Sequence, residues 1–183
     1  MKESKSHSQL EMGLDPEEHY FMSKHITLKV DTLKMNFTPY ALAMMSNGLF
    51  RVIESYKEND TPILKYFLYC ASIELGLKSS ILSIDNSKAV KYQLKKKVCH
   101  DLIEANNLFL KKNPSQVILD SNDLISLAKI NPFFKNKGLE YINTDVIVEL
   151  MKGLSNFPDL EEIRSIAAKI NKFLLMKKLY INL

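Results

Sequence analysis

The spacing of apolar residues along the chain predicts helices. Thr38-Pro39 supplies an N-cap and a first-turn proline, and apolar side chains then recur every three or four residues to about Lys57. They form one stripe of Leu42, Met45, Leu49, Val52, Ile53 and Tyr56. Thr61-Pro62 repeats this start signal, and the segment that follows to about Ile84 is the most apolar in the chain. We therefore predict that this segment is the central helix of a bundle.

Two Asn-Pro pairs mark helix ends in the second half of the chain. An amphipathic segment over 99–112 stops at Asn113-Pro114, and a short helix over 121–130 stops at Asn131-Pro132. A proline disfavours the helical conformation of the residue before it, so both pairs predict the end of a helix. Residues 132–142 then have the composition of a loop with aromatic anchors.

The end of the chain predicts two further helices. Residues 143–150 form the first, and Gly153 caps it. Asp159 with Glu162 predicts a capping box at the start of the second. The buried stripe of this last helix is Leu160, Ile163, Ile166, Ala167, Ile170, Phe173 and Leu174. Together the segments predict an all-α fold, an up-and-down helical bundle of about four to six helices.

The N-terminal residues lack a clear pattern. Residues 1–19 are polar and are expected to be a flexible tail, with 20–183 forming a single helical domain. Residues 21–33 fit a strand as well as a helix, and only the all-α class favours the helix. We find no apolar signal segment and nothing that approaches 18 consecutive apolar residues, so we expect a cytoplasmic protein that does not enter a membrane.

Composition supports the helical class and narrows the chemistry. The chain has 183 residues with only 5 Gly and 6 Pro, which argues against turn-rich β folds. Its net charge of +4 permits nucleic acid as a partner without demanding it. Nearly all of the 25 basic residues are lysine, which suits a solvated face better than two-pronged phosphate recognition. No metal-ligand spacing or nucleotide-binding motif occurs, so no metal and no cofactor are expected.

The two cysteines, Cys70 and Cys99, show no CxxC spacing or disulfide framework. We expect reduced thiols, although a disulfide between them remains open. Cys99 adjoins His100, but neighbours on a helix point about 100° apart and do not easily form a nucleophile and base pair.

One acid and one base interrupt the apolar face of the central helix. Glu74 lies in the middle of that face, and Lys78 follows one turn later. Burying either charge alone costs several kcal/mol, so each needs the other or a third partner. Two explanations are open. In the first, the two residues form a structural ion pair or lie at a dimer seam. In the second, Glu74 binds a polar group from another helix and shifts the pKa of one of the two groups.

His100 is the expected second group, because it is the only histidine beyond the first 25 residues. If a helix runs through it, His100 shares a face with Glu104, Asn107 and Lys111. It would then be exposed to solvent in a monomer. It could still line a cleft shared with another helix or a second subunit and transfer protons there. The alternative is a solvated histidine beside Asp101 at a helix start.

A run of lysines precedes His100. Residues 88–112 carry seven positive and two negative side chains. Such a patch can bind phosphates by charge, and the interleaved Tyr92 and Phe109 add aromatic surface. A simple solvated face is the alternative explanation. The candidate RNA-binding residues are Lys78, Lys91, Lys96, Lys97 and Asn107.

The strings YFLYCASIELGLKSSIL at 66–82 and KKKVCHDLIEANNL at 95–108 resemble the prokaryotic HEPN superfamily. In many of its members an E-x-x-L-K stretch on one helix is followed by a basic residue and by a His-Asp-Leu that opens the next helix. The matching residues are Glu74, Leu77, Lys78, Lys95 or Lys96, His100, Asp101 and Leu102. The resemblance covers roughly residues 40–112, with a HEPN-like core at about 38–112 and additional C-terminal helices at 121–183.

This resemblance implies an all-α domain that commonly forms a homodimer. In catalytic members it implies a metal-independent endoribonuclease, in which an Arg and a His spaced as R-x4-6-H act from both subunits. A histidine would serve as general acid or base while a 2′-hydroxyl attacks the adjacent phosphate. Such proteins occur in toxin-antitoxin, phage-defence and nucleotidyltransferase-associated systems, which implies a cognate antitoxin or nucleotidyltransferase as a partner.

The chain departs from this pattern at one position. Lys95 stands in x4 spacing to His100, where the family has arginine, and lysine lacks the planar two-pronged contact. Three hypotheses follow. The protein cleaves RNA with His100, Lys95 and Glu74 as the catalytic set; it is a non-catalytic dimer that binds RNA, a nucleotide or a protein; or its polar residues are purely structural.

Overall fold

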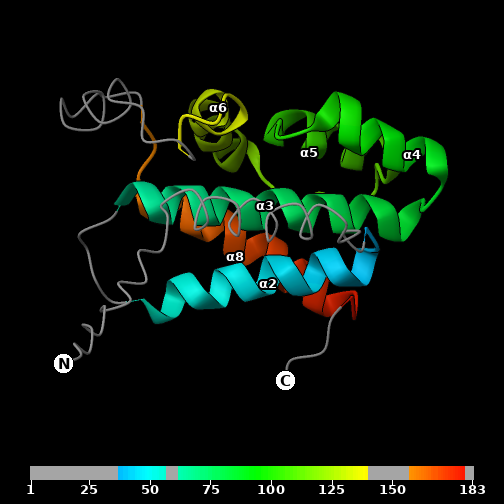
Figure 1. Cartoon of the computed structure of the whole chain (residues 1–183), viewed down its shortest axis with the longest axis horizontal. Helices are drawn as coiled ribbons and strands as arrows, with labels where there is room; N and C mark the ends of the chain where they lie inside the picture. The colour runs from blue at the N-terminus through cyan, green and yellow to red at the C-terminus, as the bar shows by residue number, and fades with distance from the viewer. Residues whose placement is uncertain (1–36, 57–61, 140–156, 180–183) are drawn as a thin grey trace, which may run out of the picture. The chain divides into compact units, whose positions relative to one another are not determined.

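The central element is helix α3 (Pro62–Ile84), and the other helices pack around it. Helices α2 (Pro39–Ser55) and α8 (Leu160–Met176) lie on one side of it, while α4 (Lys88–Gln93), α5 (Leu102–Lys112) and α6 (Ser121–Lys135) lie on the other (Figure 1). A π-helical turn (Leu94–Val98) continues α4. The computed structural model describes residues 37–56, 62–139 and 157–179, and these contain helices and no strand. The predicted all-α bundle is confirmed.

Two predicted helix starts are confirmed by side-chain caps. The Thr38 hydroxyl accepts a hydrogen bond from the Ala41 amide at 3.2 Å, and Pro39 occupies the first turn. Asp159 begins α8 by accepting from the Glu161 amide at 3.0 Å. These side chains satisfy amides that have no partner within the helix.

The predicted capping box between Asp159 and Glu162 is wrong. The Glu162 carboxylate instead accepts a hydrogen bond from the Ser126 hydroxyl of α6 at 2.7 Å, so a tertiary contact outcompetes the local one. The reciprocal box occurs at the start of α6, where Asp120 and Asp123 each accept from the other's backbone amide.

Helix α3 is buried on nearly all sides in its second half. A Cβ placed on Gly76 would overlap the Ile170 side chain of α8 and lie 3.0 Å from the Ser46 hydroxyl of α2. The absence of a side chain at Gly76 therefore allows three helices to approach closely. At the same level Ser46 and Ser72 hydrogen bond to each other's backbone carbonyls, and Asn171 donates to the Ser72 hydroxyl at 3.1 Å. This network satisfies the polar groups that the close packing buries.

The length and mean hydropathy of α3 meet the criteria for a membrane-crossing helix. Inside the bundle, 67% of the tested window is buried. A core helix passes the same test, so the finding is weak evidence for a membrane segment.

The buried face of α2 differs from the predicted stripe. Leu42 and Ile53 are buried as expected, but Met45, Val52 and Tyr56 are exposed. The face toward α3 and α8 runs instead through Leu42, Ala43, Ser46 and Ile53. A stripe of apolar residues does not include this face, because the polar Ser46 belongs to the buried network with Ser72 and Asn171.

The predicted end of α6 is also wrong. The helix continues through Pro132 to Lys135, although an interior proline removes a backbone hydrogen bond and costs about 3 kcal/mol. The two residues after it provide compensating packing. Phe133 contacts Phe157 with ring centroids 5.1 Å apart, and the buried Phe134 contacts Phe67 of α3 at 6.1 Å. The expected loop therefore begins only after Lys135.

The last helix is confirmed, with its predicted stripe residues Ile163, Ile166, Ala167, Ile170 and Leu174 buried. The predictions for residues 1–36, Thr61, the 143–150 helix and Gly153 fall outside the described residues.

Candidate functional site

The candidate site starts from the ion pair on α3. Lys78 donates from its ammonium to Oε1 of Glu74, one helical turn earlier, and both side chains are about nine-tenths buried. The predicted pairing of acid and base is confirmed. The same ammonium donates to the backbone carbonyl of Cys99 at 2.6 Å. Lys78 thereby connects the central helix to the turn between the π-helical segment and α5.

His100 lies in that turn. Its Nδ1 lies 3.1 Å from Oε2 of Glu74, the oxygen that Lys78 does not occupy. The predicted proximity of Glu74 and His100, 26 residues apart in sequence, is confirmed. A carboxylate only accepts hydrogen bonds, so this contact requires a proton on Nδ1. In the neutral imidazole, Nε2 then keeps its lone pair.

The chain conformation at Cys99 determines where His100 points. Cys99 has a φ of 46°, in the left-handed region, and its amide closes the wide π-helical turn on Leu94 at 3.0 Å. Helix α5 begins only at Leu102, with the Asp101 side chain accepting from the Glu104 amide. Of the two alternatives, a helix that runs through His100 and places it on one face with Glu104, Asn107 and Lys111 is therefore wrong, and His100 lies just before the start of the helix.

The imidazole is held on one edge and open on another. The Phe134 ring of α6 packs edge-to-face against it, with centroids 6.0 Å apart and planes at 89°. Still, 47% of the His100 side chain is exposed, and Nε2 has no hydrogen-bond partner among the described residues. An oriented imidazole with a free basic nitrogen is the arrangement that general acid-base chemistry needs.

Asp101 ties the site to α6. Its carboxylate accepts from the Asn131 amide at 3.1 Å and from the Lys135 ammonium at 2.7 Å. Partial burial pushes the pKa of Asp101 upward, but hydrogen bonds from Lys135, the Glu104 amide and Asn131 outweigh it and hold that pKa below its ordinary value. Asp101 thus stays ionised beside His100 at neutral pH.

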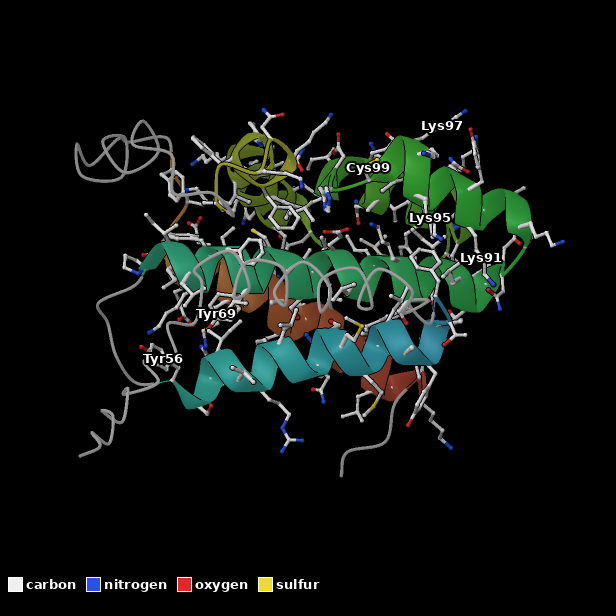
Figure 2. All side chains as sticks on the ribbon, viewed as in Figure 1. Tyr56, Tyr69, Lys91, Lys95, Lys97 and Cys99 are labelled. Atoms are coloured by element: carbon white, nitrogen blue, oxygen red, sulfur yellow. The ribbon has the colours of Figure 1, made fainter. Side chains whose placement is uncertain are left out.

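The lysines before His100 spread over different directions. Lys95, Lys96 and Lys97 are exposed, whereas Leu94 and Val98 of the same turn are buried. Figure 2 shows Lys97 on the side that faces away from α3, while Lys91 and Lys95 lie on the side toward it. The Lys95 ammonium lies 5.2 Å from the centre of the Phe37 ring, just before α2. Lys95 was predicted to be a cation beside His100, but its ammonium contacts Phe37 and not His100.

Two candidate RNA-binding residues differ in their surroundings. Asn107 is exposed on α5 and can be reached by a ligand. Lys78 is buried and fully engaged with Glu74 and Cys99, so it supports the site and does not offer a surface contact. The prediction that Lys78 is one of the RNA-binding residues is therefore corrected.

Sequence reasoning missed the contribution of α6. Asn131, Phe134 and Lys135 all contact the His100 turn. Asn131 was expected at a helix end, and Phe134 and Lys135 in a loop. The aromatic pair at 133–134 was the only available signal, since aromatic side chains in such a segment indicate packing against a core.

Other chemistries find less support in the described part of the chain. Cys70 and Cys99 are free thiols, Cys70 buried in α3 and Cys99 exposed. Burial raises the pKa of the Cys70 thiol, which makes it unreactive at neutral pH. No group of three or more metal-binding side chains occurs among the residues the structure describes.

Comparisons with protein-family models, with curated proteins and with solved structures found no match for this chain.

Proposed function

We propose that this protein is a HEPN-like helical module that acts on RNA as a metal-independent endoribonuclease, with His100 as its proton-transfer residue. The observation that carries the proposal is the hydrogen bond between His100 Nδ1 and Glu74. It orients the imidazole and assigns the proton to Nδ1, so Nε2 is the free base. The partly exposed side chain makes that nitrogen accessible to a substrate.

The reaction that fits is internal transesterification. Nε2 of His100 takes the proton from a ribose 2′-hydroxyl, the O2′–P bond forms, and the P–O5′ bond breaks. The products are a 2′,3′-cyclic phosphate and a 5′-hydroxyl, and the leaving oxygen takes its proton from a protonated His100 of a second copy or from water. Glu74 stabilises the imidazolium that forms, and Lys78 balances the buried carboxylate.

Exposed lysines would supply charge to the RNA backbone. Lys95, Lys96 and Lys97 are each exposed just before His100, and the π-helical turn that carries them contains no acidic residue. Cations in this position attract phosphates without reading sequence. The resemblance of residues 40–112 to HEPN proteins supports a homodimer, and it supports a cognate antitoxin or nucleotidyltransferase as a protein partner.

The test is RNA cleavage in excess EDTA by the wild type and by His100→Asn. Asparagine keeps a side-chain amide that can donate to Glu74, yet it cannot accept a proton. We expect the substitution to reduce the rate by about 10²–10⁴-fold. Equal activity of the two proteins, or no cleavage of any RNA by the wild type, would exclude the ribonuclease.

A second candidate function is RNA binding without catalysis. The observation in its favour is that Lys95, which occupies the position of the family's arginine, lies against the Phe37 ring and not beside His100. An inert wild type that still binds RNA in a strongly salt-dependent manner would support this candidate. Salt-independent binding would count against it.

A further inference from the structure

Helix α6 holds the two residues that follow His100. The Asn131 side chain accepts from the Leu102 amide at 2.8 Å and donates to the Asp101 carboxylate at 3.1 Å. Lys135, one turn later, donates to the other oxygen of Asp101 at 2.7 Å. The first amide of α5 therefore has its partner in another helix, since nothing within α5 can satisfy it. These bonds fix the turn to a helix that is distant in sequence.

The same helix also contacts the imidazole itself. Phe134 is buried, packs on Phe67 of α3, and meets the His100 ring edge-to-face. A half-exposed histidine that faced only Glu74 could rotate about its side-chain bonds and exchange the ring nitrogen that it presents. A fixed aromatic neighbour restricts those rotations, because the alternative rotamers lose this contact.

We propose that Asn131 and Phe134 are positioning residues that hold the His100 imidazole with Nδ1 on Glu74 and Nε2 open. The consequence for catalysis rests on the proposed function, whereas the positioning itself is measurable without RNA. A misplacement of about 1 Å in an active site can reduce the rate about 10²-fold. The C-terminal part of the chain, outside the segment that resembles HEPN proteins, thereby contributes to the site.

The effect of positioning can be distinguished from an electrostatic effect on His100. Glu74 and Lys78 face the turn from α3, Asp101 follows the histidine, and Lys135 faces it from α6. Neither Asn131 nor Phe134 carries a charge. Their substitution leaves the formal charges at the site unchanged, so a change in the protonated ring nitrogen reports geometry.

The variants are Asn131→Ala, which removes both hydrogen bonds, and Phe134→Leu, which keeps an apolar side chain but removes the ring. Ile130→Val is the matched control, since Ile130 is fully buried in the same helix and shortening it destabilises α6 without removing a group from the turn. Circular dichroism establishes that each variant is folded. If Asn131→Ala does not fold, Phe134→Leu carries the test alone.

The first readout is the tautomer of His100, measured by long-range proton–nitrogen NMR on ¹⁵N-labelled full-length protein at a pH where the ring is neutral. The His100→Asn spectrum assigns its signal among the four histidines of the chain. We expect the wild type and Ile130→Val to carry the proton on Nδ1, and Asn131→Ala and Phe134→Leu to shift toward Nε2. An unchanged tautomer in both folded variants, or a wild type protonated on Nε2, overturns the proposal.

The second readout is RNA cleavage in EDTA. We expect kcat to fall between about tenfold and 10²-fold in Asn131→Ala and Phe134→Leu with little change in KM, and to be retained in Ile130→Val. If the wild type cleaves no RNA, the proposed function is lost and the NMR result alone decides the positioning. If the wild type cleaves RNA and the tautomer does not respond, the positioning is lost and the ribonuclease stands.

Discussion

The Lys78 ammonium donates a hydrogen bond of 2.6 Å to the backbone carbonyl of Cys99, 21 residues later in the chain. Because the same ammonium pairs with Glu74, one buried cation connects the central helix to the turn that carries His100. The acid, the base and the histidine therefore form one unit. A change in any of them is expected to affect both stability and the site.

Replacing Lys78 by methionine should destabilise the protein strongly. The substitution keeps the length of the side chain but leaves Glu74 buried without its cation, and breaking a buried pair in this way costs about 3–5 kcal/mol. The measurement is urea unfolding followed by circular dichroism. The double variant Glu74→Gln with Lys78→Met removes both charges and should recover part of the loss. A single variant as stable as the wild type would show that the pair is not buried as described.

Two glycines should respond oppositely to alanine. Gly76→Ala places a methyl group against Ile170 and Ser46, so overpacking of about 1–3 kcal/mol exceeds the gain in helix propensity. Gly48→Ala in α2 meets nothing within 4 Å and should stabilise the protein by up to about 1 kcal/mol. Thermal unfolding of both variants tests the close packing of α2, α3 and α8. Two changes of the same sign would contradict it.

The lysines before His100 should account for much of the salt dependence of RNA binding. Changing Lys95, Lys96 and Lys97 to glutamine should reduce the slope of log affinity against log salt by about 2, since each contact to a single-stranded phosphate contributes about 0.7. The control is the same change at three exposed lysines outside this segment, Lys129, Lys172 and Lys178. Equal slopes for the two triple variants would exclude the segment as the RNA-binding surface.

The stability of the protein should depend on Asp101 in acid. Its pKa is held below the ordinary value of 3.8 in the folded state, so the unfolded state binds more protons as the pH falls. The stabilising contribution is complete above the ordinary pKa and is lost as the pH falls below about 4 through the lowered value. Lys135→Met removes the hydrogen bond that lowers this pKa most, and it should flatten the dependence. Urea unfolding at several pH values checks this, and identical profiles for wild type and variant would contradict it.

Local patterns were sufficient for most of the helices and for the ion pair. Thr38-Pro39 is a start signal that acts within one turn, and Glu74 with Lys78 are neighbours on any helix. His100 was expected beside Glu74 because it is the only histidine beyond the first 25 residues, and its Nδ1 lies 3.1 Å from Glu74.

Features that depend on tertiary contacts could not be predicted from the sequence. The π-helical turn and the positive φ of Cys99 arise where the chain must bury Leu94 and Val98 and still reach Lys78. Helix α6 passes Pro132 because Phe133 and Phe134 find partners in other segments. No local propensity contains that information.

The central claim is that His100 takes a proton from a ribose 2′-hydroxyl, and mass spectrometry of the products of metal-free digestion tests it most directly. An RNA oligonucleotide and a DNA oligonucleotide of the same sequence are incubated in EDTA with the wild type and with His100→Asn. We predict 2′,3′-cyclic phosphate ends from RNA with the wild type alone, and intact DNA in every reaction. Cleavage of the DNA by the wild type, or the same RNA products from both proteins, would contradict the claim.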